Sequence, residues 1–174
     1  RGLRGSGVAA PILCLQGLVD GSALHQGLLN AADTLSLPVS TEARVTRAML
    51  ATRQDAQSYW DSAVRAKKRK ELRRQWARLN EMGSLTMQEL PADGDAQGWL
   101  DEFLQLEARG WKGANGSALS SQSDTQGYFL DAMLAAHRQG QLVATALRMD
   151  GRAIAMLITL VSQGAGFSFK TAFD

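Results

Sequence analysis

The residue types most suited to chemistry gather in the stretch 106–119. Glu107 lies at the end of a segment with apolar helical spacing, and Trp111 and Lys112 follow it among three glycines. Such a glycine-rich loop is expected to turn sharply and to hold an aromatic ring and a cation in fixed places. Glu107 is a candidate general base, a task that needs a carboxylate within hydrogen-bond reach of an amine. Trp111 is a candidate for stacking on a substrate, and Lys112 for pairing with an anionic group of it.

Each of these residues also has a plainer interpretation. Glu107 can be a helix-end carboxylate that bonds to the following loop. Trp111 can be a buried anchor of that loop, because aromatic rings usually pack, and Lys112 can simply be solvated. His137, near the end of a predicted helix, is expected to be a core or helix-end histidine rather than a catalyst.

The last predicted strand, 167–173, carries a second pair of candidates. Strict alternation places Lys170 and Asp174 on one face of the strand. Lys170 is a candidate substrate-binding residue and Asp174 a second candidate catalytic carboxylate, with a salt bridge between the two as the alternative. The same alternation places three aromatic side chains on the opposite face: Phe167, Phe169 and Phe173.

The elements that must position these residues follow from periodicity and turn signals. A helix is predicted from about Asp95 to Arg109, where Gly110 ends it, and another from Ser123 or Asp124 through His137. A meander then follows, with strands at 142–149, 153–161 and 167–173. Its first turn is Asp150–Gly151, the strongest short-range hairpin signal. Upstream, the patterns predict strands at 8–18, 44–50 and 85–90, a helix from Ser22 to about Thr34, and a helical region that begins near Asp55.

A strongly basic segment lies within that helical region. Residues 65–78 contain eight Lys or Arg against one acid, Glu71. The segment can bind a polyanion, either nucleic acid or an anionic membrane surface. However, Leu72, Trp76 and Leu79 recur at the spacing of a helix that lies on a core, and no aromatic platform for nucleic acid accompanies the charges. A solvated basic face on a packed helix, ended by Gly83, is therefore the competing interpretation.

Composition limits the class of protein and the kinds of site that this sequence can form. The 174 residues are 45% apolar and 21% charged, which is typical of a soluble globular protein, and the net charge is +2. A single cysteine, Cys14, excludes a disulfide framework, and one cysteine with two histidines excludes the usual zinc clusters. No apolar run reaches the roughly 20 residues that span a bilayer, so a cytoplasmic protein without a transmembrane segment is expected. The chain starts without Met and stops within a strand pattern, which predicts a fragment of a longer protein.

Several motifs, taken together, resemble one family. They are FLQLEARGWKG (103–113) with GSAL (116–119), LRMDGRAIA (147–155), FKTAFD (169–174) and, upstream, KKRKELRRQWARL (67–79) followed by Gly83. In order and spacing the sequence from about 44 to 174 resembles the GNAT-superfamily acetyltransferases associated with bacterial cellulose biosynthesis. The resemblance implies an α/β (α+β) fold with a mixed, largely antiparallel sheet flanked by helices. It also implies a partial tandem repeat like that of the peptidoglycan-bridge aminoacyl transferases.

In this interpretation residues 1–94 are the C-terminal part of a first GNAT-like half, which includes the basic helix. Residues 95–174 begin a second half. The resemblance implies acetyl-CoA as the acyl donor, held by a glycine-containing turn at a helix N-terminus. The sequence stops before such a turn, so no cofactor-binding residue is assigned, and the fragment alone is expected to be inactive.

The expected function is an acetyl-CoA-dependent N-acyltransferase. Its acceptor would be an amine or hydroxyl on a small molecule, glycan or peptide, in exopolysaccharide or cell-envelope biosynthesis. A non-catalytic GNAT-like interaction module and polyanion binding through residues 65–78 are the alternatives. No specific nucleic-acid partner is expected, and the oligomeric state is left open.

Overall fold

A computed structural model describes residues 12–46 and 49–174, in two compact units, Arg1–Thr52 and Arg53–Asp174. In the first unit, Ser22 caps helix α1 (Ala23–Thr34), as predicted, by accepting a hydrogen bond from the His25 amide. The strands predicted at 8–18 and 44–50 are wrong for their described residues, which form neither strand nor helix. Residues 8–11 and 47–48 lie outside the described part of the chain.

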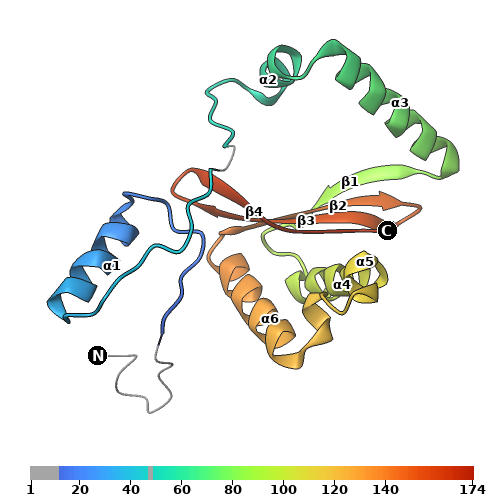
Figure 1. Ribbon diagram of the computed structural model, residues 1–174. Helices are drawn as coiled ribbons and strands as arrows, with labels where there is room; N and C mark the ends of the chain where they lie inside the picture. Colours follow the sequence, from blue (N-terminus) through green and yellow to red (C-terminus); the bar gives the residue numbers. More distant parts are fainter. Residues whose placement is uncertain (1–11, 47–48) are drawn as a thin grey trace. The chain divides into compact units, whose positions relative to one another are not determined.

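The second unit is built on a four-stranded antiparallel sheet (Figure 1). Its strands are β1 (Leu85–Glu89), β2 (Leu142–Met149), β3 (Arg152–Ser162) and β4 (Ala165–Phe173), in the order β1-β2-β3-β4. All three neighbouring pairs are antiparallel. The predicted α/β fold with a largely antiparallel sheet is therefore confirmed, and each strand lies within two residues of its expected bounds.

Two tight turns produce the β2–β3–β4 meander. Asp150 and Gly151 have φ angles of 50° and 82°, and Gln163 and Gly164 repeat that geometry with 50° and 76°. Two successive left-handed residues are the signature of a two-residue type I′ hairpin, whose twist matches that of the strands. The Asp-Gly turn was predicted. The Gln-Gly turn is shorter than the five-residue turn expected at 162–166, since Ser162 and Gly166 already belong to strands.

Four helical segments lie on one face of this sheet: α4 (Ala96–Arg109), α5 (Trp111–Ala114), η1 (Leu119–Ser121) and α6 (Ser123–Arg138) (Figure 1). Helix α4 starts near Asp95 and ends at Gly110, as predicted, and Asp95 is its N-cap. The cap predicted at Ser123 or Asp124 is off by a residue, because Ser123 is already helical and Gln122 is the N-cap. Between helices and sheet lies the core, whose largest fully buried side chains are Phe103, Leu100, Leu106 and Ile158.

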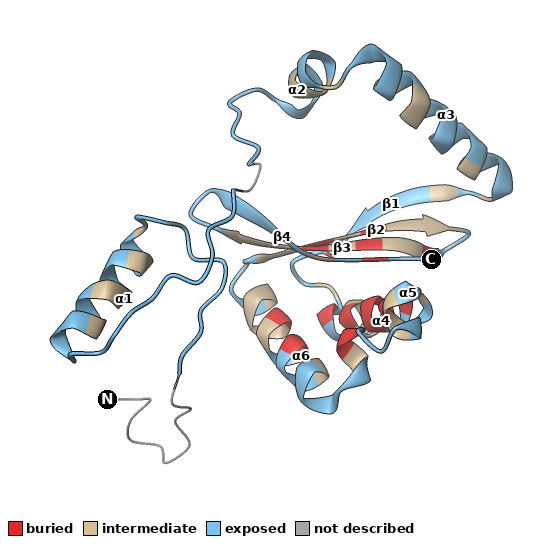
Figure 2. Ribbon diagram, in the orientation of Figure 1, coloured by how far each residue is buried: buried red, intermediate tan, exposed pale blue. Residues whose placement is uncertain are grey.

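Helices α2 (Ala56–Ala63) and α3 (Ala66–Met82) precede β1. Asp55 caps α2 and Gly83 ends α3, as predicted. Neither helix contains a buried residue, and Figure 2 shows the buried positions gathered in the sheet, in the helices that cover it and in their connections. The expectation that α3 lies on a core is therefore wrong for the described residues, and Trp76 is 45% exposed.

The two compact units divide after Thr52, whereas the predicted boundary between two GNAT-like halves lies at residue 94 and stays a prediction. Strand β1 precedes that boundary but pairs with β2 along its whole length, from Leu85 opposite Met149 to Glu89 opposite Thr145. A cut at 94 would therefore divide one sheet. The tandem arrangement stays a prediction.

Candidate active site

Glu107 is the one charged side chain that is buried among the described residues. It lies on the last turn of α4, and both of its carboxylate oxygens are occupied. Oε1 accepts a hydrogen bond from Lys112 Nζ at 2.8 Å, and Oε2 accepts one from the Leu119 amide at 2.8 Å. A buried carboxylate needs such partners, because desolvation without them costs several kcal/mol. The expectation of a carboxylate bonded to the following loop describes this geometry, and the role as base stays a prediction.

Lys112 is also held in place by hydrogen bonds, like its partner Glu107. Its ammonium group also donates to the Thr171 carbonyl on β4 at 2.9 Å, and only 21% of its side chain is exposed. The interpretation of Lys112 as merely solvated is therefore wrong. Through Glu107 and Lys112, the end of α4, the loop before η1 and the edge strand β4 are joined by charge-assisted hydrogen bonds, which are stronger than neutral ones.

Glycines allow this loop to fold closely against its neighbours. A Cβ atom on Gly113 would overlap the Ala108 carbonyl oxygen of α4, so only glycine fits there. A Cβ on Gly110 would lie 3.1 Å from the Phe173 carbonyl oxygen, which places the start of α5 beside the end of β4. Gly116 has a φ of 66°, a conformation that glycine adopts without strain. The sharply turning loop predicted here is confirmed, although four of its residues form the short helix α5.

Trp111 lies on the surface of this fixed segment. It is 59% exposed, so its interpretation as a buried anchor is wrong. Phe173, on the strand end next to Gly110, is also exposed. Two exposed aromatic side chains therefore come from neighbouring backbone segments at one end of β4. Substrate stacking by Trp111 is compatible with this exposure.

Asp174 and Lys170 do not pair with each other. Asp174 Oδ2 accepts from Arg152 Nη2 at 2.8 Å, across to strand β3, and the Asp174 amide donates to the Ile154 carbonyl. The predicted salt bridge within the strand is therefore wrong. Asp174 remains 44% exposed at its side chain, within reach of solutes. The structure gives Lys170 no ion-pair partner among the described residues.

A register shift explains why strict alternation fails along β4. Ile158 lies opposite Lys170, but Thr159 lies opposite Ser168, so Phe169 is an extra residue in the strand. A bulge of this kind turns the chain so that later residues change face. The Phe169 ring accordingly stacks on Phe129 of α6 at 6.4 Å, on the helix-covered side. The prediction that the three aromatic residues share the face opposite Lys170 is wrong for this reason.

A second ion pair, which the sequence did not reveal, joins α4 to the sheet. Arg148 binds Glu102 through two hydrogen bonds of 2.7 and 2.6 Å, donates to Gln88 on β1, and lies over the Trp99 ring at 5.4 Å. The hydrogen bonds from Arg148 hold the pKa of Glu102 below its usual value, and the carboxylate raises the pKa of Arg148. The useful signal was Arg148 at an inward position of a strand whose other residues, apart from Thr145, are apolar.

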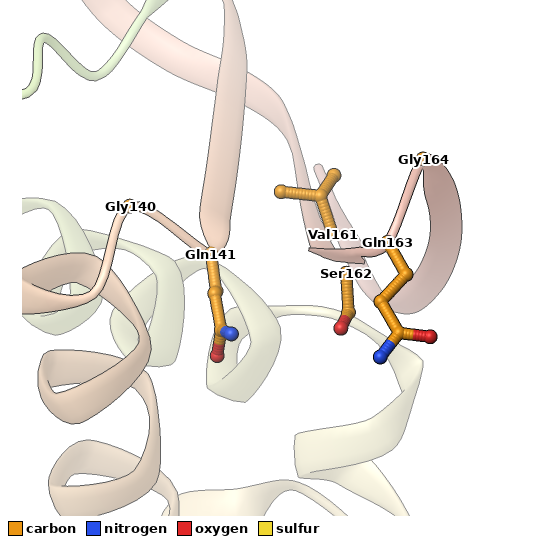
Figure 3. Close-up of a pocket in the computed structure, with 6 residues that line it drawn as sticks. All are labelled: Gly140, Gln141, Val161, Ser162, Gln163 and Gly164. Atoms are coloured by element: carbon orange, nitrogen blue, oxygen red, sulfur yellow. The ribbon is translucent and has the colours of Figure 1, made fainter.

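One hollow lies away from these residues. Gly140, Gln141 and the turn 161–164 line it, and Figure 3 shows the Gln141, Ser162 and Gln163 side chains beside it. It is at the β3–β4 turn, the opposite end of β4 from Asp174, and it contains no titratable side chain. A smaller hollow lies between α4 and the η1–α6 segment and is lined by six residues: Asp101, Leu104, Gln105, Ala108, Ser120 and Gln126. Neither hollow brings the predicted site residues together.

The described residues offer little to a metal or to the pyrophosphate of a nucleotide. They contain no group of three His, Cys, Asp or Glu side chains arranged for a metal ion. No described helix follows β4, so the glycine turn and helix N-terminus expected to hold acetyl-CoA are not among these residues. None of the helices in the described ranges is long and apolar enough to cross a membrane.

The comparisons with known proteins agree with the sheet and its helices. Residues 66–174, which include α3, the sheet and every helix on its covered face, match the family described as the acetyltransferase (GNAT) domain. Searches of curated proteins and of solved structures returned no match. Because the matched region is more than half of the sequence, the family follows from it: the chain belongs to the GNAT acetyltransferases.

Proposed function

We propose that this protein is an acetyl-CoA-dependent N-acyltransferase. Its membership of the GNAT family is the observation that carries the proposal. The β2–β3–β4 meander, the helices on one sheet face and the exposed end of β4 support it. The acceptor is an amine or hydroxyl of a small molecule, glycan or peptide, and a place in exopolysaccharide or cell-envelope biosynthesis is the pathway we infer from the sequence resemblance.

The chemistry is a direct acyl transfer. The acceptor nitrogen attacks the thioester carbonyl carbon, a C–N bond forms, the C–S bond breaks with CoA leaving as the thiolate, and the acceptor proton passes to a carboxylate or to water. Strand β4 is at the edge of the sheet. Backbone amides on such an edge are available to a ligand, and they would stabilise the oxyanion. No described residue fits the pyrophosphate of the donor, so no step is assigned to its binding.

The two candidate carboxylates differ in how freely they can accept a proton. Asp174 is partly exposed, and its partner Arg152 is 61% exposed at its side chain. Glu107 has 1% of its side chain exposed and both oxygens bonded. We therefore propose Asp174 as the proton acceptor. Glu107 would act as a base only by releasing Lys112 or the Leu119 amide, and we propose that it positions the loop that carries Trp111.

The acceptor would bind beside the exposed Trp111 and Phe173. The indole face can stack on a sugar or another planar group, and Lys170 can pair with an anionic substituent. This position lies next to Asp174, the residue that follows Phe173 in the chain. The proposal thus places substrate binding and proton transfer at the same end of β4.

The test measures acetyl transfer by the natural protein that contains residues 1–174. Purified protein is incubated with acetyl-CoA and a panel of amines, amino sugars and hydroxyl acceptors, and free CoA and acetylated product are both quantified. Loss of a general base typically costs about 10²- to 10⁴-fold in rate. Asp174→Asn should therefore lower kcat by about that factor, while Trp111→Ala should mainly raise the KM for the acceptor.

The outcomes separate the alternatives. Absence of both acetyl-CoA binding and transfer would favour a non-catalytic GNAT-like module. Activity that survives Asp174→Asn but not Glu107→Gln would instead assign the base to Glu107. A thermal-stability measurement on each variant separates loss of chemistry from loss of folding.

A further inference from the structure

The charge of the chain is concentrated on α3. Residues 65–82 contain eight basic residues and two acids, Glu71 and Glu81, for a net charge of +6. The whole chain has a net charge of +2, so the remainder has a net charge of −4. Within the described residues, the structure gives no ion-pair partner to five cations of this helix: Lys67, Lys70, Arg73, Arg74 and Arg78. A large positive field therefore arises from one helix.

The same helix exposes an apolar stripe. Leu72, Trp76 and Leu79 follow one another at i, i+4 and i+7, the spacing of a single face. Trp76 is 45% exposed, the two leucines are half-buried, and the helix contains no buried residue. Basic residues lie within one turn of the stripe, since Lys68 precedes Leu72 by four positions and Arg73 precedes Trp76 by three.

Helix α3 is fixed to its neighbours at both ends. Arg69, near its start, donates to the Asp61 and Val64 carbonyls at the end of α2. At its other end, Gly83 packs against the Asp150 carboxylate, and the Ser84 amide donates to Asp150 Oδ1 at 2.8 Å. Between these two ends, the apolar stripe and the five cations that have no ion-pair partner among the described residues are available to bind a partner.

We propose that α3 binds the surface of an anionic lipid bilayer. Leu72, Trp76 and Leu79 lie at the headgroup boundary, and the surrounding lysines and arginines pair with lipid phosphates. A helix with Lys and Arg on its polar face and Trp and Leu on its apolar face binds in the plane of such an interface. Each Lys or Arg near an anionic surface adds attraction, and their long alkyl chains let the charges reach the phosphates while the stems cover apolar surface.

The bilayer is favoured over nucleic acid by the apolar stripe. A nucleic-acid backbone would neutralise the cations, because its binding is dominated by phosphate contacts, but it would leave Leu72, Trp76 and Leu79 in water. A bilayer surface accommodates both features at once. The proposal does not depend on acyl transfer, since it concerns a helix outside the candidate active site.

Vesicle sedimentation of the whole protein tests the proposal. The vesicles are phosphatidylcholine alone or phosphatidylcholine with phosphatidylglycerol, and binding is expected only to the second. The triple variant Arg73→Gln, Arg74→Gln, Arg78→Gln should bind at least a hundredfold more weakly, because each cation contributes about fivefold in affinity. The control triple variant changes three exposed arginines outside α3 to Gln and lowers the net charge equally: Arg53, Arg109 and Arg138. It should retain most of the binding.

The apolar contribution needs its own variant. Trp76→Ala should weaken binding, whereas Trp111→Ala, which removes another exposed indole, should not. Quenching of fluorescence by brominated lipids should be larger in the wild type than in Trp76→Phe. Circular dichroism establishes that each variant remains folded.

Four results would overturn the proposal. They are no binding to phosphatidylglycerol vesicles, equal losses in the two triple variants, an unquenched Trp76, and salt-sensitive binding to DNA without binding to vesicles. An unquenched Trp76 that is also shielded from iodide in the free protein would show instead that the stripe packs within the protein.

Discussion

Helices α3 and α4 are both amphipathic, but only α4 has a partner for its apolar face. Helix α4 buries six residues against the sheet and α6, among them Leu100 and Phe103, which are fully buried. Helix α3 is three residues longer and buries none. Their charged side chains also differ in whether they have partners. Glu102 and Glu107 of α4 each bind a cation from another element, whereas five cations of α3 have no ion-pair partner among the described residues. Apolar spacing thus predicts the helix and its inner face, but not what that face contacts.

The largest expected effect is in the core under α4. Phe103→Ala removes a fully buried ring that stacks on Phe129 at 5.7 Å, and such a change typically lowers the free energy of unfolding by about 3–5 kcal/mol. Trp76→Ala is the matched change on α3, and it should cost about 0.5 kcal/mol or less, as exposed substitutions do. Chemical denaturation measures both. A similar loss for Trp76→Ala would mean that the apolar stripe of α3 is buried in solution.

The next effect concerns the two ion pairs at the end of β4. Glu107→Ala leaves the Lys112 ammonium group and the Leu119 amide without their acceptor, and breaking a buried pair in this way costs about 3 kcal/mol or more. Asp174→Ala removes the acid of the exposed Arg152 pair and should cost about 1 kcal/mol or less. Thermal unfolding of both variants tests this. Equal losses would show that Glu107 is more accessible than its burial indicates.

A smaller effect distinguishes a crowded glycine from a free one. Gly113→Ala forces a methyl group against the Ala108 carbonyl, and overpacking of this kind costs about 1–3 kcal/mol. Gly127→Ala in α6 has open space around it and should instead stabilise by about 0.4–1 kcal/mol, because alanine restricts the unfolded chain. The midpoint of denaturation should move in opposite directions in the two variants. Destabilisation by both would indicate a contact at Gly127.

The smallest expected effect is the contribution of Glu102 to the pH dependence of stability. Its pKa in the folded protein is lowered from a usual value of 4.5, chiefly by hydrogen bonds from Arg148. The stabilisation is therefore fully present above pH 4.5 and is lost as the pH falls below it, by about 1 kcal/mol or less. Arg148→Met should flatten this part of the curve of stability against pH. An unchanged acid limb would assign the loss to other carboxylates.

Much of the second unit could be predicted from local sequence. The Asp150–Gly151 turn, the start of a helix near Asp95 and its stop at Gly110 depend on residues that are near in sequence, and all three are confirmed. The strands predicted at 8–18 and 44–50 are not formed by their described residues, because alternation in 44–50 describes a possible strand but supplies no neighbouring strand. The bulge at Phe169 depends on the register with β3, which the sequence of β4 alone does not determine.

The candidate site was predictable in its residues but not in its contacts. The stretch around Glu107 and Lys112 was singled out for its residue types, and the structure brings these two side chains together. The hydrogen bond between Lys112 and Glu107, and the one from Lys112 to the Thr171 carbonyl, depend on how α5 folds back on α4 at Gly113. The partner of Asp174 comes from another strand, and so it could not be inferred from spacing within β4.

The pairing of β1 has a consequence for the order of folding. Its register with β2 brings together residues as distant in sequence as Leu85 and Met149, with α4, α5 and α6 between them. The β2–β3 and β3–β4 hairpins need only two-residue turns to form. Because closing a longer loop costs more entropy and slows folding, we expect the meander to form before β1 pairs with β2. The reciprocal hydrogen bonds between Ser84 and Asp150 join the start of β1 to the β2–β3 turn, so we expect them to form in that late step.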